Sequence, residues 1–190
     1  VEDTSEIDGI IVATGMGCYV NTTAFMKEIL ETPPESLLAP TAFIHSTDNT
    51  IAGQIGLILK NKNYNTTYNQ KGVAFLNALF DAKLMIEEGA ETVLLGAVDE
   101  ILPQLMVQEQ LEKDLVLSEG ATFFLLKKEP KDALAKMDCC SIERPDEGSA
   151  LDSMLSAHLK KSGGDTPDLI LYGDSFLNNL VVPDRIATIP

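Results

Sequence analysis

Residues 64–100 predict a strand, a tight turn, a helix and a second strand, and this succession constrains the fold more than any other part of the chain. Residues 64–68 alternate β-prone side chains and predict a polar strand. Residues 72–88 place apolar side chains around most of a helix, so we expect that helix to be buried. Residues 91–98 form a continuous apolar run that is typical of a buried strand.

The turn between the polar strand and the helix is where a covalent catalyst would hold its nucleophile. The free N–H groups and the positive dipole end of a helix stabilise a developing anion at such a place. Gln70 stands there between Asn69 and Lys71, and neither Cys nor Ser occupies the turn. Gln70 is either a surface helix cap or an interior residue, and the polar strand before it and the buried helix after it favour the interior position.

The remaining pattern indicates an α/β domain. Further strands are expected at residues 7–15, 120–126 and 168–172, and further helices at residues 21–30, 51–59 and 149–161. Apolar strands without period-two alternation, separated by helices, predict a mostly parallel sheet with both faces covered. We expect a single domain over residues 1–190, with the only plausible weak boundary at residues 131–148.

Composition limits the binding partners and the cellular compartment that we expect for this chain. A formal charge of −15 disfavours nucleic acid, and no apolar run is long enough to span a membrane. Three cysteines, two of them adjacent, give no disulfide framework and no zinc spacing, and the acidic amino terminus lacks the features of a secretory signal. We therefore expect a cytoplasmic protein without metal or cofactor.

The other reactive side chains are expected to play structural or surface roles. Cys18 and the pair Cys139 and Cys140 lie away from any predicted helix start and are interpreted as inert thiols. His45 is expected in a loop, and His158 on a solvent-facing helix. Asp99 and Glu100 are expected to accept hydrogen bonds from neighbouring backbone N–H groups. Asp174 and Ser175 lack the partner histidine that a hydrolase needs.

Four segments, taken in order, resemble the β-ketoacyl synthase family of the thiolase fold. They are VATGMG at residues 12–17, NTIAGQI at residues 49–55, GAETVLLGAVDE at residues 89–100 and SEGA at residues 118–121. The amino-acid sequences of residues 47–53 and 64–72 further resemble those of the family branch that is linked to aryl-polyene and flexirubin pigment clusters. The resemblance implies a thiolase-like layered αβαβα architecture, of which this chain would form the N-terminal half and the start of the C-terminal half.

The same resemblance implies a degenerate active site. Family enzymes use a cysteine at a helix amino terminus and two histidines, and here Gln70 falls at the cysteine position. The first histidine would lie near Gly173, where Tyr-Gly-Asp-Ser stands instead. No catalytic residue is therefore intact, and Gln70, Lys71 and Gly72 are the expected substrate-binding residues.

The resemblance leaves three functions open. The chain is interpreted first as a non-catalytic, chain-length-factor-like subunit in fatty-acid or polyketide-type biosynthesis. Such a subunit would pair with an active condensing synthase and shape the acyl pocket of that synthase. An acyl carrier protein would deliver the acyl group to the synthase. Residues 64–68 would lie at the dimer interface. The alternatives are an active 3-oxoacyl-acyl-carrier-protein synthase with an unrecognised site, and a structural or regulatory homodimer without acyl binding.

Overall fold

The computed structural model describes residues 6–101, 118–129, 132–137, 140, 157–161, 170–172 and 186–188. The chain divides into two compact units, Val1–Asp132 and Ala133–Pro190. The division falls inside residues 131–148, the stretch in which the sequence predicts a weak boundary.

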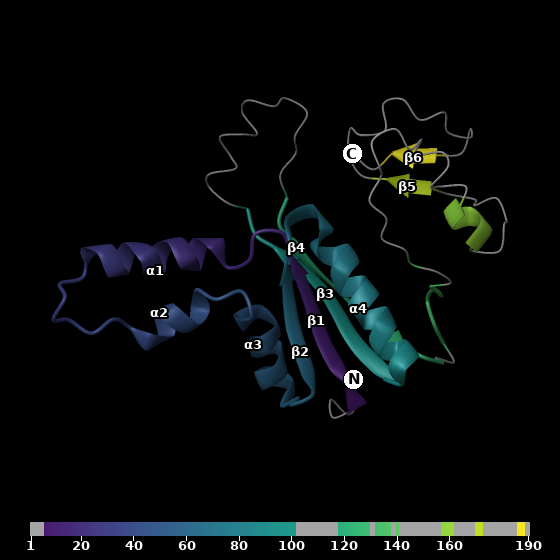
Figure 1. Ribbon diagram of the computed structural model, residues 1–190, viewed down its shortest axis with the longest axis horizontal. Helices are drawn as coiled ribbons and strands as arrows, with labels where there is room; N and C mark the ends of the chain where they lie inside the picture. Colours follow the sequence, from purple (N-terminus) through teal and green to yellow (C-terminus); the bar gives the residue numbers. More distant parts are fainter. Residues whose placement is uncertain are drawn as a thin grey trace. The chain divides into compact units, whose positions relative to one another are not determined.

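The first unit is built on a four-stranded sheet in the order β2-β1-β3-β4 (Figure 1). Its strands are β1 (Gly9–Thr14), β2 (Tyr64–Asn69), β3 (Thr92–Asp99) and β4 (Gly120–Lys127). Strands β2 and β3 both pair with β1 in parallel, whereas β4 pairs with β3 antiparallel. The expected mostly parallel α/β sheet is confirmed.

Helices cover both faces of the sheet at β1, the strand with every residue buried. Helix α3 (Thr50–Leu59) packs on one face, where Ala52 meets Ile10 and Val12. Helix α4 (Ala74–Glu88) packs on the other face and contributes Ala74, Ala78 and Ala82 to a core with β1 and β3. Side chains of β1 therefore contribute in turn to two separate cores, because successive side chains of a strand point to opposite faces of the sheet.

The polar sequence of β2 is explained by hydrogen bonds to α3 rather than by apolar packing. Asn65 donates its side-chain N–H to the Ala52 carbonyl over 2.9 Å, and the Ala52 N–H donates to the Thr67 hydroxyl over 3.4 Å. Just before the strand, Asn61 and Asn63 both donate to the Ile7 carbonyl. These bonds hold an edge strand whose other side is unpaired among the described residues.

The expectation that the helix after the turn is buried on most faces is wrong for this chain. Leu76, Phe80 and Leu84 on α4 are 45%, 36% and 38% exposed. Small alanines face the sheet, whereas these three larger residues lie on the opposite side of the helix. The helix is therefore apolar on two opposite sides, and among the described residues only the side toward the sheet is covered. A helix of this pattern suits the middle layer of a layered fold.

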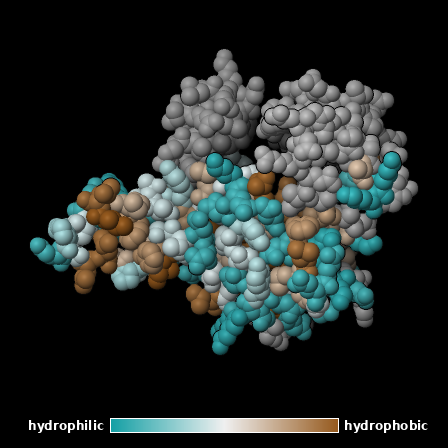
Figure 2. Space-filling view, in the orientation of Figure 1, coloured by the Kyte–Doolittle hydropathy of each residue, from teal (hydrophilic) through white to brown (hydrophobic). Residues whose placement is uncertain are grey.

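Helix α1 (Tyr19–Glu31) and helix α2 (Pro40–His45) pair with each other and bury no residue completely. Phe25 and Phe43 meet with ring centroids 5.8 Å apart. Figure 2 shows hydrophobic residues gathered over this pair. The exposed large apolar residues of the two helices include Met26, Leu30 and Phe43. Helix α2 replaces the loop that the sequence predicts, and its signal was Pro40 at the first helical position.

In the second unit, β5 (Ile170–Tyr172) pairs in parallel with β6 (Ile186–Thr188). The sequence predicts the first of these strands but not the second. A helical turn is present at residues 157–161, within the predicted helix at residues 149–161, whose earlier part lies outside the described residues.

Candidate functional site

The carboxyl ends of β1, β2 and β3 meet at one edge of the sheet, and the turns that follow them build the candidate site. Thr14 pairs with Asn69 at the ends of β1 and β2, and β3 ends beside them at Asp99. Ligands of open α/β sheets bind outside the carboxyl ends of the strands. The side chains that fix the turns after these strands determine the shape of the site.

Asp99 clamps the turn after β1. Its Oδ1 atom accepts a hydrogen bond from the Thr14 hydroxyl over 3.1 Å and one from the Gly15 N–H over 2.7 Å. The Thr14 oxygen in turn accepts from the Gly17 N–H over 3.0 Å. The structural role predicted for Asp99 is confirmed.

Asp48 fastens the same turn to the end of β2. One carboxylate oxygen accepts from the Cys18 N–H over 3.1 Å, and the other accepts from the Asn69 side-chain N–H over 2.7 Å. Asp48 lies in the turn before α3, yet its carboxylate accepts a hydrogen bond from Cys18, the residue that caps the amino terminus of α1. Gly17 makes the close approach possible, because its φ is +66° and an added Cβ would lie 2.0 Å from Asp48 Oδ1.

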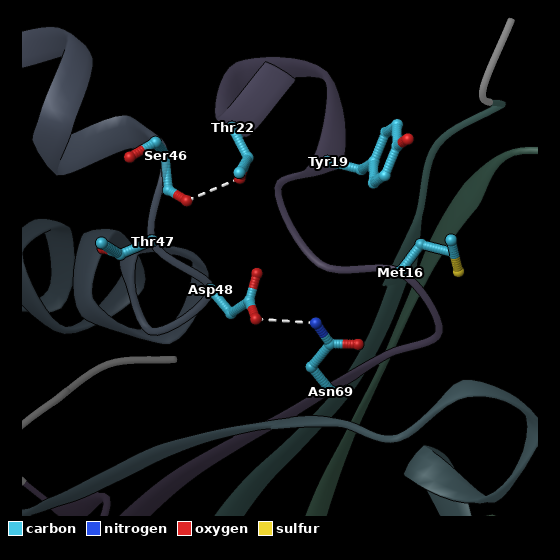
Figure 3. Close-up of a pocket in the computed structure, with 7 residues that line it drawn as sticks. All are labelled: Met16, Tyr19, Thr22, Ser46, Thr47, Asp48 and Asn69. Carbon is cyan, nitrogen blue, oxygen red and sulfur yellow. Dashed lines mark hydrogen bonds between the residues drawn. The ribbon is translucent and has the colours of Figure 1, made fainter. Parts of the chain in front are cut away.

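A pocket of about 460 Å³ opens beside this junction. Figure 3 shows Asp48 and Asn69 facing each other on one side and Tyr19 and Met16 on the other. Thr22, Ser46 and Thr47 complete the lining, and the Thr22 hydroxyl donates to the Ser46 carbonyl over 2.7 Å. The wall therefore combines two large partly exposed side chains with polar groups already engaged in hydrogen bonds.

The turn that carries Gln70 is a sharp elbow between β2 and α4. Gln70 is exposed in this chain and precedes a 3₁₀ turn, Lys71–Val73, that leads into α4. Its side-chain oxygen accepts a hydrogen bond from Asn77. The interior position predicted for Gln70 is thus not observed, since no part of the chain that the structure describes covers this residue.

Lys71 is the strained residue of the elbow. Its φ is +51°, a left-handed conformation that is costly for a side chain with a Cβ. Its N–H donates to the Gly15 carbonyl over 3.1 Å, which ties the elbow to the turn that Asp99 clamps. Strained residues cluster at functional sites, and the strain lies one residue after the position that the sequence singles out. That Gln70, Lys71 and Gly72 bind substrate stays a prediction.

Cys18 stands at the amino-terminal cap of α1, so the expectation that no cysteine lies at a helix start is wrong. The interpretation of an inert thiol is nevertheless supported by its surroundings. Burial, and then the negative charges of Asp48 and Glu100, raise the pKa of the Cys18 thiol. The thiolate that a nucleophile needs is therefore disfavoured.

Two tyrosines and an aspartate form a second polar cluster on the α4 side of β2. The Tyr64 hydroxyl donates to Asp81 Oδ2 over 3.1 Å. Burial, together with the negative charge of Asp81 and a hydrogen bond to it, raises the pKa of Tyr68 to about 12. Asp81 therefore contacts phenols from both ends of the strand.

The raised pKa of Tyr68 predicts a loss of stability at high pH. The protonated phenol stabilises the fold fully below pH 10, its ordinary pKa, and this contribution disappears as the pH rises from 10 to about 12. Tyr68→Phe should therefore lose less stability between pH 9 and pH 11 than the wild-type chain. Urea unfolding at the two pH values measures this, with Tyr19→Phe as the control. Equal losses in all three proteins would contradict it.

The remaining predicted positions are distributed over the chain. His45 ends α2 instead of lying in a loop, and His158 is on the short helical turn at residues 157–161. Cys139 and the degenerate histidine position near Gly173, with Asp174 and Ser175, lie outside the described residues. Within the part of the chain that the structure describes, no three His, Cys, Asp or Glu side chains gather as a metal site. No helix of that part is long and apolar enough to cross a bilayer.

A polar edge strand, a left-handed elbow, a helix and an apolar parallel strand define the α/β domain around the candidate site, and neither Cys nor Ser stands in the elbow. Residues 1–161 match the family described as beta-ketoacyl synthase, N-terminal domain, and the chain belongs to it. The resemblance drawn from the four segments is confirmed. No curated protein matches the chain in sequence.

Solved structures support the thiolase-like fold. The ishigamide ketosynthase/chain length factor aligns with a TM-score of 0.63 and 20% identity, over 87% of this chain and 51% of that chain. The ketosynthase ApeO in complex with its chain length factor ApeC, from Xenorhabdus doucetiae, aligns with a TM-score of 0.54 and 18% identity, over 66% of this chain and 51% of that chain. This chain therefore spans about half the length of the solved structures that it matches.

Proposed function

We propose that this chain is a non-catalytic, chain-length-factor-like subunit that pairs with an active condensing synthase and shapes its acyl pocket. One observation carries the proposal: the elbow between β2 and α4 has Asn69, Gln70 and Lys71 where covalent acyl transfer needs a thiol or hydroxyl. An amide cannot replace a thiolate as a nucleophile. Cys18, the described cysteine next to the site, is buried and has a raised pKa.

The fold offers a place for the partner. Strand β2 is the edge of the sheet, and among the described residues it pairs only with β1. It carries neither the lysine nor the proline with which proteins usually block an open edge. The matched structures are ketosynthases with chain length factors. We infer that the partner's sheet continues across β2, which would cover Gln70 and the pocket beside Asn69.

In this arrangement the catalytic steps belong to the partner. An acyl carrier protein would deliver the acyl group to the partner's nucleophile, and Gln70, Met16 and Tyr19 would limit the space into which the chain grows. The cysteine content fits a reducing cytoplasm. Co-expression with candidate condensing synthases from the same genome, followed by purification through a tag on this chain, tests the pairing. Recovery of a stoichiometric complex supports the proposal, and a homodimer that excludes the synthase contradicts it.

Gln70→Cys tests whether residue 70 holds the former nucleophile position. A thiol at the start of a helix and beside Lys71 should have a lowered pKa, so we expect iodoacetamide to react about threefold faster at pH 7 than with an ordinary exposed thiol. Gln54→Cys, on the exposed side of α3, is the matched control. Peptide mass mapping separates the new thiol from the native cysteines. A rate at or below that of the control would place the site elsewhere.

A further inference from the structure

We propose that Asp81, held by Tyr64 and Tyr68, is a recognition site for a basic side chain of the synthase subunit and disfavours pairing between two copies of this chain. The inference rests on the proposed function, because it concerns the subunit that would pair with β2. It adds the chemistry by which that subunit is selected.

The position of Asp81 places its charge at the middle of the open edge. Tyr64 and Tyr68 stand at i and i+4 on β2, and both contact the same carboxylate. We infer that Asp81 lies over the part of the strand Tyr64–Asn69 between these two tyrosines. Tyr64 is 46% exposed, so the cluster is open to an approaching subunit.

The charge of Asp81 is not balanced within the described residues. The ion pairs found there are Lys27 with Glu31 and Lys83 with Glu87, and neither involves Asp81. Phenol hydrogen bonds hold the carboxylate in place without neutralising it. On a chain with 29 acidic and 14 basic residues, a basic side chain of another molecule is the natural complement to this carboxylate.

Pairing between two identical copies would place like charges together. An antiparallel pairing centred on β2 relates the copies by a two-fold axis that passes through the middle of the strand. The two Asp81 carboxylates would then lie on the same face of the joined sheet, one on each side of the axis. Like charges in facing positions oppose the pairing. A lysine or arginine of a different subunit at the same place removes the repulsion and gains an ion pair.

Affinity for the co-purified synthase measures the effect directly. We expect Asp81→Asn, which keeps the shape of the side chain, to weaken binding about tenfold, and Asp81→Arg to weaken it about thirtyfold or more. Glu35→Arg, the same change of charge on an exposed residue between α1 and α2, should leave the affinity unchanged. The wild-type affinity should fall with added salt, and that of Asp81→Asn should depend on salt less. Unchanged circular dichroism verifies folding.

A second measurement uses this chain alone. An equimolar mixture of the wild-type chain and Asp81→Arg should dimerise at least about fivefold more tightly in sedimentation velocity than either protein by itself. The mixture with Glu35→Arg should show no such gain. If the wild-type chain binds the synthase and Asp81→Arg binds it equally well, the inference fails while the proposed function stands. If the wild-type chain binds no synthase, the proposed function fails. If, in addition, the mixture of the wild-type chain and Asp81→Arg dimerises no more tightly than either protein alone, the inference fails as well.

Discussion

Gly17→Ala is expected to reduce the free energy of unfolding by about 3 kcal/mol, more than any other single change considered for this chain. The φ of +66° at Gly17 costs a residue with a Cβ about 1–2 kcal/mol. The new Cβ would also lie 2.0 Å from Asp48 Oδ1 and 2.7 Å from the side-chain nitrogen of Asn69. Asp48 can move away only by giving up its hydrogen bonds to Cys18 and Asn69.

Gly53→Ala is the matched control for that substitution. Gly53 lies inside α3, and an added Cβ would meet no atom within 4 Å. Because glycine weakens a helix relative to alanine, Gly53→Ala should raise the free energy of unfolding by about 0.5–1 kcal/mol. Urea unfolding of both variants compares the two directions. A loss below about 1 kcal/mol for Gly17→Ala would mean that the turn is not braced as described.

Asp99→Ala should produce the second largest effect, a loss of about 2–3 kcal/mol. The substitution removes the acceptor of both the Thr14 hydroxyl and the Gly15 N–H. Thr14 is buried, so its hydroxyl proton would have no replacement partner from solvent. The turn that holds the Lys71 elbow through the Gly15 carbonyl would loosen with it. We therefore expect Asp99→Ala to weaken the binding of the synthase as well.

Glu100→Ala separates this role from a general effect of removing charge. Glu100 is the next residue along the chain, is exposed, and should change stability by no more than about 0.5 kcal/mol. Thermal unfolding of the two variants side by side gives the comparison. Equal effects would show that charge at the end of β3, and not the hydrogen bonds of Asp99, stabilises the turn.

The order of elements could be predicted from the sequence because periodicity reports burial directly. The apolar runs of β1 and β3 and the elbow after β2 follow from residue pattern alone. Helix α4 was more difficult, since its outward apolar residues look the same in sequence as its buried ones. Helix α2 has six residues, too few for periodicity to identify.

The candidate site could be predicted only in part. Asp99 was recognisable because a carboxylate at the end of a buried strand commonly satisfies nearby backbone N–H groups. Asp48 could not be recognised in this way, because its hydrogen-bond partners Cys18 and Asn69 lie 30 and 21 positions away along the chain. The strain at Lys71 gives no sequence signal, since a lysine carries no preference for a positive φ. Contacts between distant segments are set by tertiary packing, which local pattern does not record.

Intact mass spectrometry of the purified complex after incubation with an acyl thioester of the acyl carrier protein measures which polypeptide the acyl group joins. We predict that the synthase partner gains the mass of the acyl group and that this chain, with an amide at residue 70, keeps its own mass. An acyl adduct on any residue of this chain would contradict the proposed division of labour.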